Sequence, residues 1–336
     1  MGKKWAVALR LTLGLGLLAL ILYFVDLREV VAVVTALEPW YLVAVLAVMY
    51  LDRALMAYKW RPLLRDAGVH LPYSVLLRSY LIAPLAAIFL PSTVGGDLFR
   101  LYHLSRYKVD TRAVLASIVV ERVIGFVAML AVVGVGVGLG LYLLSDRWEE
   151  LAAIVGALAV ALLLGAGLAL VLVGVAFGGV RRLVDRVAAR LARYPLVGKL
   201  HQVYTLYTQY LNRRRTLAVV FAWTLLEQMA PVVSVFILAQ ALHVNVSFLQ
   251  LVAIVPLVLL AARMPVSLDG LGVMEGMYVA LFALVGVSVE ESLLLAAFGR
   301  VLQNLPGLPF LVHYVFERRR APPVARQAQA DLVETP

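Results

Sequence analysis

Residues 73–112 read YSVLLRSYLIAPLAAIFLPSTVGGDLFRLYHLSRYKVDTR. The first half of this stretch is mainly apolar, and Pro84, Pro91, Gly95 and Gly96 interrupt the stretch as a whole. Proline removes a backbone donor and glycine weakens a helix interior, so an unbroken helix is disfavoured here. A full transmembrane helix needs about 20 consecutive apolar residues. The stretch therefore predicts a segment that enters the membrane, breaks and turns back.

The distribution of basic residues favours the same interpretation. If residues 73–90 crossed the membrane completely, the basic residues that follow them would lie outside, together with the arginine-rich stretch 179–215. Lysine and arginine are instead enriched in cytoplasmic loops. If the segment turns back, every basic loop lies inside, and the acidic stretch 145–150 and Glu290–Glu291 lie outside. The charges thus predict a re-entrant hairpin.

The composition of the whole chain is that of a membrane protein. Of the 336 residues, 63% are hydrophobic and 15% are charged, and the mean hydropathy is +0.93. A soluble domain carries about 25% charged residues. The net charge of +10 is concentrated in short loops, which indicates the positive-inside bias rather than a nucleic-acid partner. The chain has no cysteine, which excludes disulfides and thiolate chemistry. Its scattered histidines and its lack of a phosphate-loop motif predict no metal site, no cofactor and no direct use of ATP.

The fold class predicted is an all-α polytopic membrane protein with about six full transmembrane helices and two oppositely oriented re-entrant hairpins. The first half, residues 1–146, contains spans 5–25 and 40–58, the hairpin 73–112 and span 113–144. The second half, residues 147–316, contains spans 151–178 and 216–242, the hairpin 248–287 and span 292–316, with a cytoplasmic amphipathic segment at 179–215. Residues 59–72 are expected to form a basic cytoplasmic loop that includes Lys59. Residues 317–336 are expected to form a disordered cytoplasmic tail, and both termini are expected inside the cell.

The two halves are predicted to be inverted repeats. Polar landmarks recur at a nearly constant offset: Asp52 with Glu227, Pro91 with Pro265, and Arg122 with Arg300. Inverted repeats with broken helices are a recurring plan of secondary transporters, whose substrates bind where the repeats meet. Chance matching in a chain rich in alanine, leucine and valine is the alternative.

Candidate functional residues follow from the cost of burying charge in a membrane, which makes ionisable residues at that depth functional candidates. Glycines at a helix start expose backbone N–H groups to an anion, and arginine is a forked donor for phosphate. The candidates for substrate binding are Gly95, Gly96, Asp97, Arg100, Glu121, Arg122, Arg263, Asp269, Gly270, Gly272, Glu275 and Arg300, with Asp52 and Glu227 as secondary candidates. Together they predict a site for a lipid phosphate. The alternative is that the charged residues only pair with one another to hold the halves together.

The arginine-rich stretch 179–215 has apolar residues at helical spacing opposite its basic face. This pattern predicts a helix lying on the inner leaflet. A specific site for a lipid headgroup is the alternative for this stretch.

Three short stretches resemble a known family. Leu90–Arg100 (LPSTVGGDLFR), Glu121–Gly125 (ERVIG) and Pro265–Glu275 (PVSLDGLGVME) are similar to motifs of the flippase-like family that includes the transmembrane domain of lysylphosphatidylglycerol synthase. The resemblance covers residues 5–316. It implies movement of a phospholipid or a polyprenyl-phosphate-linked lipid between the leaflets of a prokaryotic plasma membrane. Asp97 stands where glutamate is expected in the family.

The leading functional hypothesis is therefore a secondary lipid flippase without a catalytic residue. Protons are a candidate coupling ion, carried by Asp97, Glu121, Asp269 or Glu275. The alternative is an intramembrane lipid-modifying enzyme, or the membrane subunit of a glycosyl or aminoacyl lipid transferase. Aminoacyl transfer itself is not expected, because the chain ends soon after its last span. The lipid, the direction of movement and the oligomeric state stay open.

Overall fold

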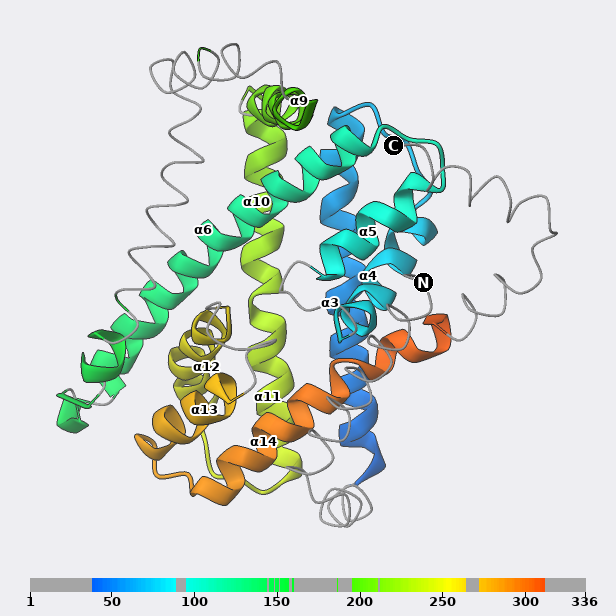
Figure 1. Cartoon of the computed structure of the whole chain (residues 1–336). Coiled ribbons are helices and arrows are strands. Elements are labelled where there is room, and N and C mark those ends of the chain that lie inside the picture. Colours follow the sequence, from blue (N-terminus) through cyan, green and yellow to red (C-terminus); the bar gives the residue numbers. More distant parts are fainter. Residues whose placement is uncertain are drawn as a thin grey trace, which may run out of the picture.

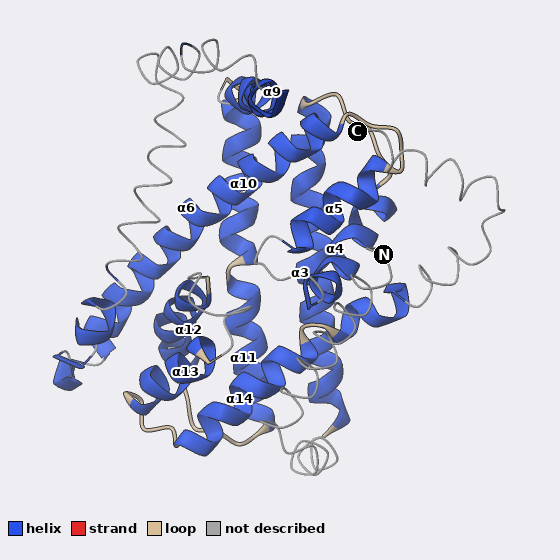
Figure 2. Ribbon diagram, in the orientation of Figure 1, coloured by secondary structure: helices blue, strands red, loops and turns tan. Residues whose placement is uncertain are grey.

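The computed structural model describes residues 38–88, 95–143, 145–147, 149–150, 152–156, 159, 186, 195–210, 212–263 and 272–311. Throughout these ranges the regular structure is helical and contains no strand (Figure 2). The helices of the first half are α3 (Pro39–Asp66), α4 (Tyr73–Ile88), α5 (Gly95–Ser105), α6 (Thr111–Leu143) and η1 (Ser145–Arg147). Those of the second half are α9 (Pro195–Tyr210), α10 (Arg214–Glu227), α11 (Met229–Ala241), α12 (Phe248–Ala262), α13 (Val273–Ala283), α14 (Val289–Leu302) and η3 (Leu305–Gly307).

Three of the described helical stretches are long and apolar enough to cross a membrane: α3, α6, and α10 followed by α11. With 28 residues in α3 and 33 in α6, a rise of 1.5 Å per residue gives lengths of about 42 and 50 Å, more than a hydrocarbon core of about 30 Å. Large apolar side chains on these helices face outward, including Val43, Leu51 and Val135, which are 63–66% exposed. Such an exposed apolar surface is the surface that a lipid bilayer covers. The protein is a multi-pass membrane protein.

Two pairs of short helices complete the structure. Helices α4 and α5 pack against each other, as do α12 and α13, while α4 also contacts α3 and α12 also contacts α6 and α11. The four helices have 11 to 16 residues, so each is about 17–24 Å long and shorter than the hydrocarbon core. In Figure 1 the α4–α5 pair lies beside the upper part of the long helices and the α12–α13 pair beside their lower part.

The buried apolar side chains form two clusters, one around each pair of short helices. One cluster contains Trp60 of α3 with residues of α4, α6, α9 and α10. The other contains Phe282 of α13 with residues of α11, α12 and α14. Helix α6 contributes to both, through Val114 in the first and Met129 in the second. Helix α6 therefore connects the two parts of the core.

Two glycines allow close backbone approach. A Cβ at Gly136 of α6 would lie 3.0 Å from the carbonyl oxygens of Val252 and Ala253 in α12, so glycine permits this crossing. A Cβ at Gly307 of η3 would overlap the carbonyl oxygen of Leu81 in α4. These contacts fix how both short-helix pairs sit against the rest of the protein.

The structure differs from the sequence-based boundaries in three places. Helix α3 continues to Asp66, so Lys59 lies within a helix and not in a cytoplasmic loop. Gln228 separates α10 from α11 inside the predicted span 216–242. The predicted span 292–316 is interrupted after Leu302 by the 3₁₀ turn η3, because Pro306 has no N–H for a continuing helix.

Several predictions fall on residues outside the described ranges. They concern span 5–25, most of span 151–178, the centre of the second hairpin and the tail 317–336. Within 179–215, the structure describes α9, and its Tyr207 and Tyr210 are buried.

Candidate functional site

The first charged cluster consists of Asp97 and Arg100 from α5 and Glu121 and Arg122 from α6. Arg100 Nη2 donates to Glu121 Oε2 at 2.6 Å, and Arg100 Nη1 donates to Asp97 Oδ1 at 3.2 Å. Arg122 Nε donates to the second oxygen of Asp97 at 2.7 Å. Two carboxylates and two guanidinium groups thus balance each other's charge between neighbouring helices.

Aromatic residues enclose the inner part of this cluster. The guanidinium carbon of Arg100 lies 4.0 Å from the ring centre of Trp60 and 4.1 Å from that of Tyr80, which gives two cation–π contacts. The Tyr80 hydroxyl donates to Glu121, and Trp60 Nε1 donates to Ser117 Oγ at 3.0 Å. Arg100 is only 4% exposed. Arg100 and Glu121 are therefore held as a buried pair, which joins α5 to α6 within the first half and does not join the two halves.

Arg122 has a different environment. Its side chain is 58% exposed, although Arg122 lies about one third of the way along a membrane helix. It is eleven positions after Thr111, the first residue of α6, which places it about 16 Å along the helix. Its hydrogen bond to Asp97 uses Nε, and no other polar contact of Arg122 is recorded in the part of the chain that the structure describes. The two Nη groups remain available to a ligand.

A second carboxylate–arginine pair joins Glu275 of α13 to Arg300 of α14. Glu275 Oε1 lies 2.9 Å from Arg300 Nη2 and accepts a hydrogen bond from Arg300 Nε at 3.1 Å. Its other oxygen accepts from the backbone N–H of Gly272 at 2.7 Å. Gly272 has a φ of +79°, a conformation that favours glycine. Glu275 thus caps α13 and holds Arg300 at the same time.

The two pairs share one arrangement. Asp97 and Arg122 are 25 residues apart, and so are Glu275 and Arg300. In each pair the carboxylate lies in the first turn of the second short helix, and the arginine lies on the next helix. The sequence offset that matches Pro91 with Pro265 does not match Asp97 with Glu275. The equal spacing of 25 residues is the signal that could have found this match.

Two candidate glycines have roles within the protein. A Cβ at Gly96 would lie 3.3 Å from the carbonyl oxygen of Ala83, so glycine lets α5 approach α4. Gly95 is buried beside it at the start of α5. The N–H of Gly272 is used by Glu275. Asp269 and Gly270 lie outside the described residues.

Lys59, which the sequence predicts to lie in a loop, is buried. It is 2% exposed, forms an ion pair with Glu227 of α10 and donates to Thr224 Oγ1 at 3.1 Å. This contact joins α3 of the first half to α10 of the second. Asp52 lies two helical turns before Lys59 on α3 and interacts with it electrostatically. A lysine on the helical face of an intramembrane aspartate was the signal for this contact.

Electrostatic interactions connect these groups across the protein. Glu121 interacts with Lys59, and Glu227 interacts with Glu121. Arg263, the residue that follows α12, is exposed. Arg122 and Arg263 are thus two exposed arginines from different halves of the chain.

These residues lie in a region that matches a known family. The family model described as the lysylphosphatidylglycerol synthase TM region matches residues 7–309, nearly the whole chain. Comparisons with curated proteins and with solved structures return no match. The family is lipid-related, and all the charged residues of the site fall within the matched range. The chain belongs to the family of the lysylphosphatidylglycerol synthase transmembrane region.

Proposed function

We propose that this protein moves an anionic lipid, a phospholipid or a polyprenyl-phosphate-linked lipid, between the two leaflets as a secondary transporter. The observation that carries the proposal is Arg122, an arginine on a membrane helix that is 58% exposed and is held by Asp97 through Nε. A lipid phosphate would gain charge-assisted contacts from the two Nη groups of Arg122, with the exposed Arg263 of the second half as a further donor, and arginine is suited to bind phosphate through two donors. Membership of a lipid-related family supports a lipid as the substrate.

The proposal includes the arrangement in the membrane. In it, α4–α5 and α12–α13 are re-entrant hairpins that enter from opposite sides, and residues 1–146 and 147–316 are inverted repeats. The short lengths of the four helices and the equal spacing of the two carboxylate–arginine pairs support this arrangement. Repeats of this kind leave the substrate between two broken hairpins near the middle of the membrane.

Single cysteines test the topology, because the chain has none of its own. We expect Lys108→Cys, which follows α5, to react with a membrane-impermeant maleimide from the same side as Arg65→Cys at the end of α3. Asp146→Cys, beyond the end of α6, should react from the other side. Labelling of Lys108→Cys from the side opposite to Arg65→Cys, with Asp146→Cys then on the side of Arg65→Cys, would mean that residues 73–105 cross the membrane once and are not re-entrant.

A reconstituted flipping assay tests the activity. Proteoliposomes containing a headgroup-labelled anionic phospholipid are treated with an impermeant quencher, and the rate at which protected label becomes accessible is measured. Each arginine is proposed to donate to the lipid phosphate, so Arg122→Gln and Arg263→Gln should each slow flipping at least about tenfold, which corresponds to about 1.4 kcal/mol. Arg112→Gln is the matched control, because Arg112 is an exposed arginine in the first turn of the same helix. Equal rates in all three variants would refute the phosphate site.

The same vesicles separate transport from chemistry. A flippase requires a sealed bilayer and leaves its lipid unchanged, whereas a lipid-modifying enzyme forms a new species in detergent as well. Lipid recovered after the assay should therefore have an unchanged mass. A new lipid product in detergent would favour the enzyme hypothesis.

The carboxylates that hold the arginines are the proposed carriers of a coupling proton. Protonating Asp97 or Glu275 would weaken its pair with Arg122 or Arg300 and so link the site to pH. We expect a pH gradient across the vesicle to change the flipping rate of the wild type, and Glu275→Gln to reduce that change. A flipping rate that does not respond to the gradient would exclude protons as the coupling ion.

A further inference from the structure

A second surface of the protein combines an apolar groove with a cluster of arginines. The groove encloses about 350 Å³ between α6, α9 and α10, a volume within the range of small-molecule sites. Its lining is almost entirely apolar and consists of Val120, Val123, Ile124, Val127, Tyr207, Tyr210, Leu217, Ala218 and Phe221. Each helix contributes residues three or four positions apart, so one face of each helix forms a wall.

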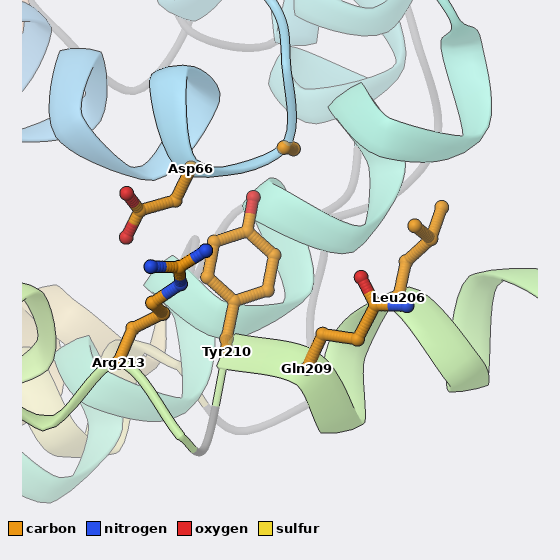
Figure 3. A pocket seen from close by; sticks show the side chains of 6 residues that line it. Asp66, Leu206, Gln209, Tyr210 and Arg213 are labelled. Atoms are coloured by element: carbon orange, nitrogen blue, oxygen red, sulfur yellow. The ribbon is translucent and has the colours of Figure 1, made fainter.

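The groove is continuous with polar residues at one end. Tyr210 lines the groove and also a small neighbouring pocket, whose walls include Asp66, Gln209 and Arg213 (Figure 3). On α10, Arg214 precedes Leu217 by three residues and so lies on the helical face that lines the groove. The apolar walls thus lead to the arginines at the start of α10.

The charge at this end is mainly positive. Arg213, Arg214 and Arg215 are consecutive and exposed, and none has a recorded ion pair among the described residues. Figure 3 shows the Asp66 side chain pointing toward Arg213. Asp66 faces Arg213, and the three consecutive arginines together keep an excess of positive charge, which complements a phosphate.

Tyr210 makes the junction between groove and pocket rigid. Its hydroxyl donates to the backbone oxygen of Leu63 at 2.7 Å. Burial, together with the Asp66 carboxylate, raises the pKa of Tyr210 above its ordinary value, so the hydroxyl keeps this proton. The ring is therefore fixed between the apolar and the basic part of the surface.

We propose that this groove binds one phospholipid with an anionic headgroup, with an acyl chain along the apolar walls and the phosphate at Arg213–Arg215. Charge and shape both indicate this ligand. A groove with apolar walls accommodates an acyl chain, and the arginines at its end favour an anionic headgroup over a zwitterionic one. The site is separate from the proposed transport site. Arg122 is two residues from Val120 and so lies on another face of α6, because successive residues are rotated by about 100°.

Native mass spectrometry of the full-length protein in detergent tests this proposal. The protein is titrated with phosphatidylglycerol or with phosphatidylcholine of the same acyl chains, and bound lipid per protein is measured. A basic residue near an anionic headgroup contributes about a fivefold preference. We expect the wild type to retain more phosphatidylglycerol than phosphatidylcholine. Arg213→Gln/Arg214→Gln/Arg215→Gln should reduce this preference at least about tenfold.

A groove-filling variant tests the position of the acyl chain. Ala218→Trp should lower the retention of both lipids, because the indole fills the chain-binding part, and Ala218→Leu should do so to a smaller extent. Val135→Trp is the control, since Val135 is an exposed residue of α6 that does not line the groove. Arg122→Gln should leave this lipid bound, which distinguishes the groove from the transport site. Equal retention of both lipids by the wild type, or unchanged binding in the monodisperse Ala218 variants, would overturn the proposal.

Discussion

Replacing Lys59 with methionine removes one partner of a buried ion pair and keeps the approximate length and shape of the side chain. Lys59 is 2% and Glu227 15% exposed in their side chains, and Lys59 also donates to Thr224. Breaking a buried pair by removing one partner costs about 3–5 kcal/mol, because the remaining charge is buried without compensation. Because Glu227 keeps a small exposed area, we expect the free energy of unfolding to fall by an amount near the lower end of this range, about 3 kcal/mol.

The double variant Lys59→Met/Glu227→Leu separates charge from packing. Exchanging both members of a buried pair for apolar residues is often neutral or stabilising. We therefore expect the double variant to be more stable than Lys59→Met alone. A double-mutant cycle gives the interaction energy, which should exceed about 1 kcal/mol for residues in direct contact.

The assay is thermal unfolding of the purified protein in detergent micelles, followed by circular dichroism and by retention of the monodisperse peak. For a chain of 150–250 residues, 1 kcal/mol shifts Tm by about 2–4 °C, so Lys59→Met should lower it by several degrees in this larger protein. Lys108→Met is the matched control, because Lys108 is exposed and its positive φ of 55° costs lysine and methionine alike. Equal Tm values for the two lysine variants, or additive losses in the double variant, would refute the importance of the pair.

Glycine substitutions give two further predictions. Gly96→Val should destabilise the α4–α5 pair by about 1–3 kcal/mol, because its Cβ meets the Ala83 carbonyl oxygen at 3.3 Å. Gly138→Ala should have almost no effect on stability, because open space surrounds that position. Thermal unfolding in detergent compares the two variants, and equal Tm values would contradict the packing argument. Gly307→Ala should reduce the yield of monodisperse protein, because its Cβ would overlap the Leu81 carbonyl oxygen of α4; a normal yield and Tm would mean that η3 can move away from α4 at little cost.

The membrane class, the helical fold and most of the charged candidates followed from the sequence, because hydropathy and charge act locally. A run of apolar residues requires a helix in lipid wherever its neighbours lie. In the same way, an ionisable residue such as Asp97, Arg122 or Glu275 stands out within an apolar helix without knowledge of its partner. Membership of the family likewise rests on sequence, over residues 7–309.

The pairing of the charges was decided by the tertiary structure. The sequence contains many carboxylates and arginines, and their distance along the chain does not say which helices pack together. Only the packing of α5 against α6 and of α13 against α14 brings Asp97 to Arg122 and Glu275 to Arg300.

The same reason explains Lys59. Hydropathy ends the span before this lysine, because a charged group in a membrane is costly when it is considered alone. The cost is offset by Glu227 and Thr224, which lie more than 160 residues away in the chain and adjoin Lys59 only in the folded protein. Local sequence determines which residues are costly to bury, and only the tertiary structure supplies the partner that makes burial possible.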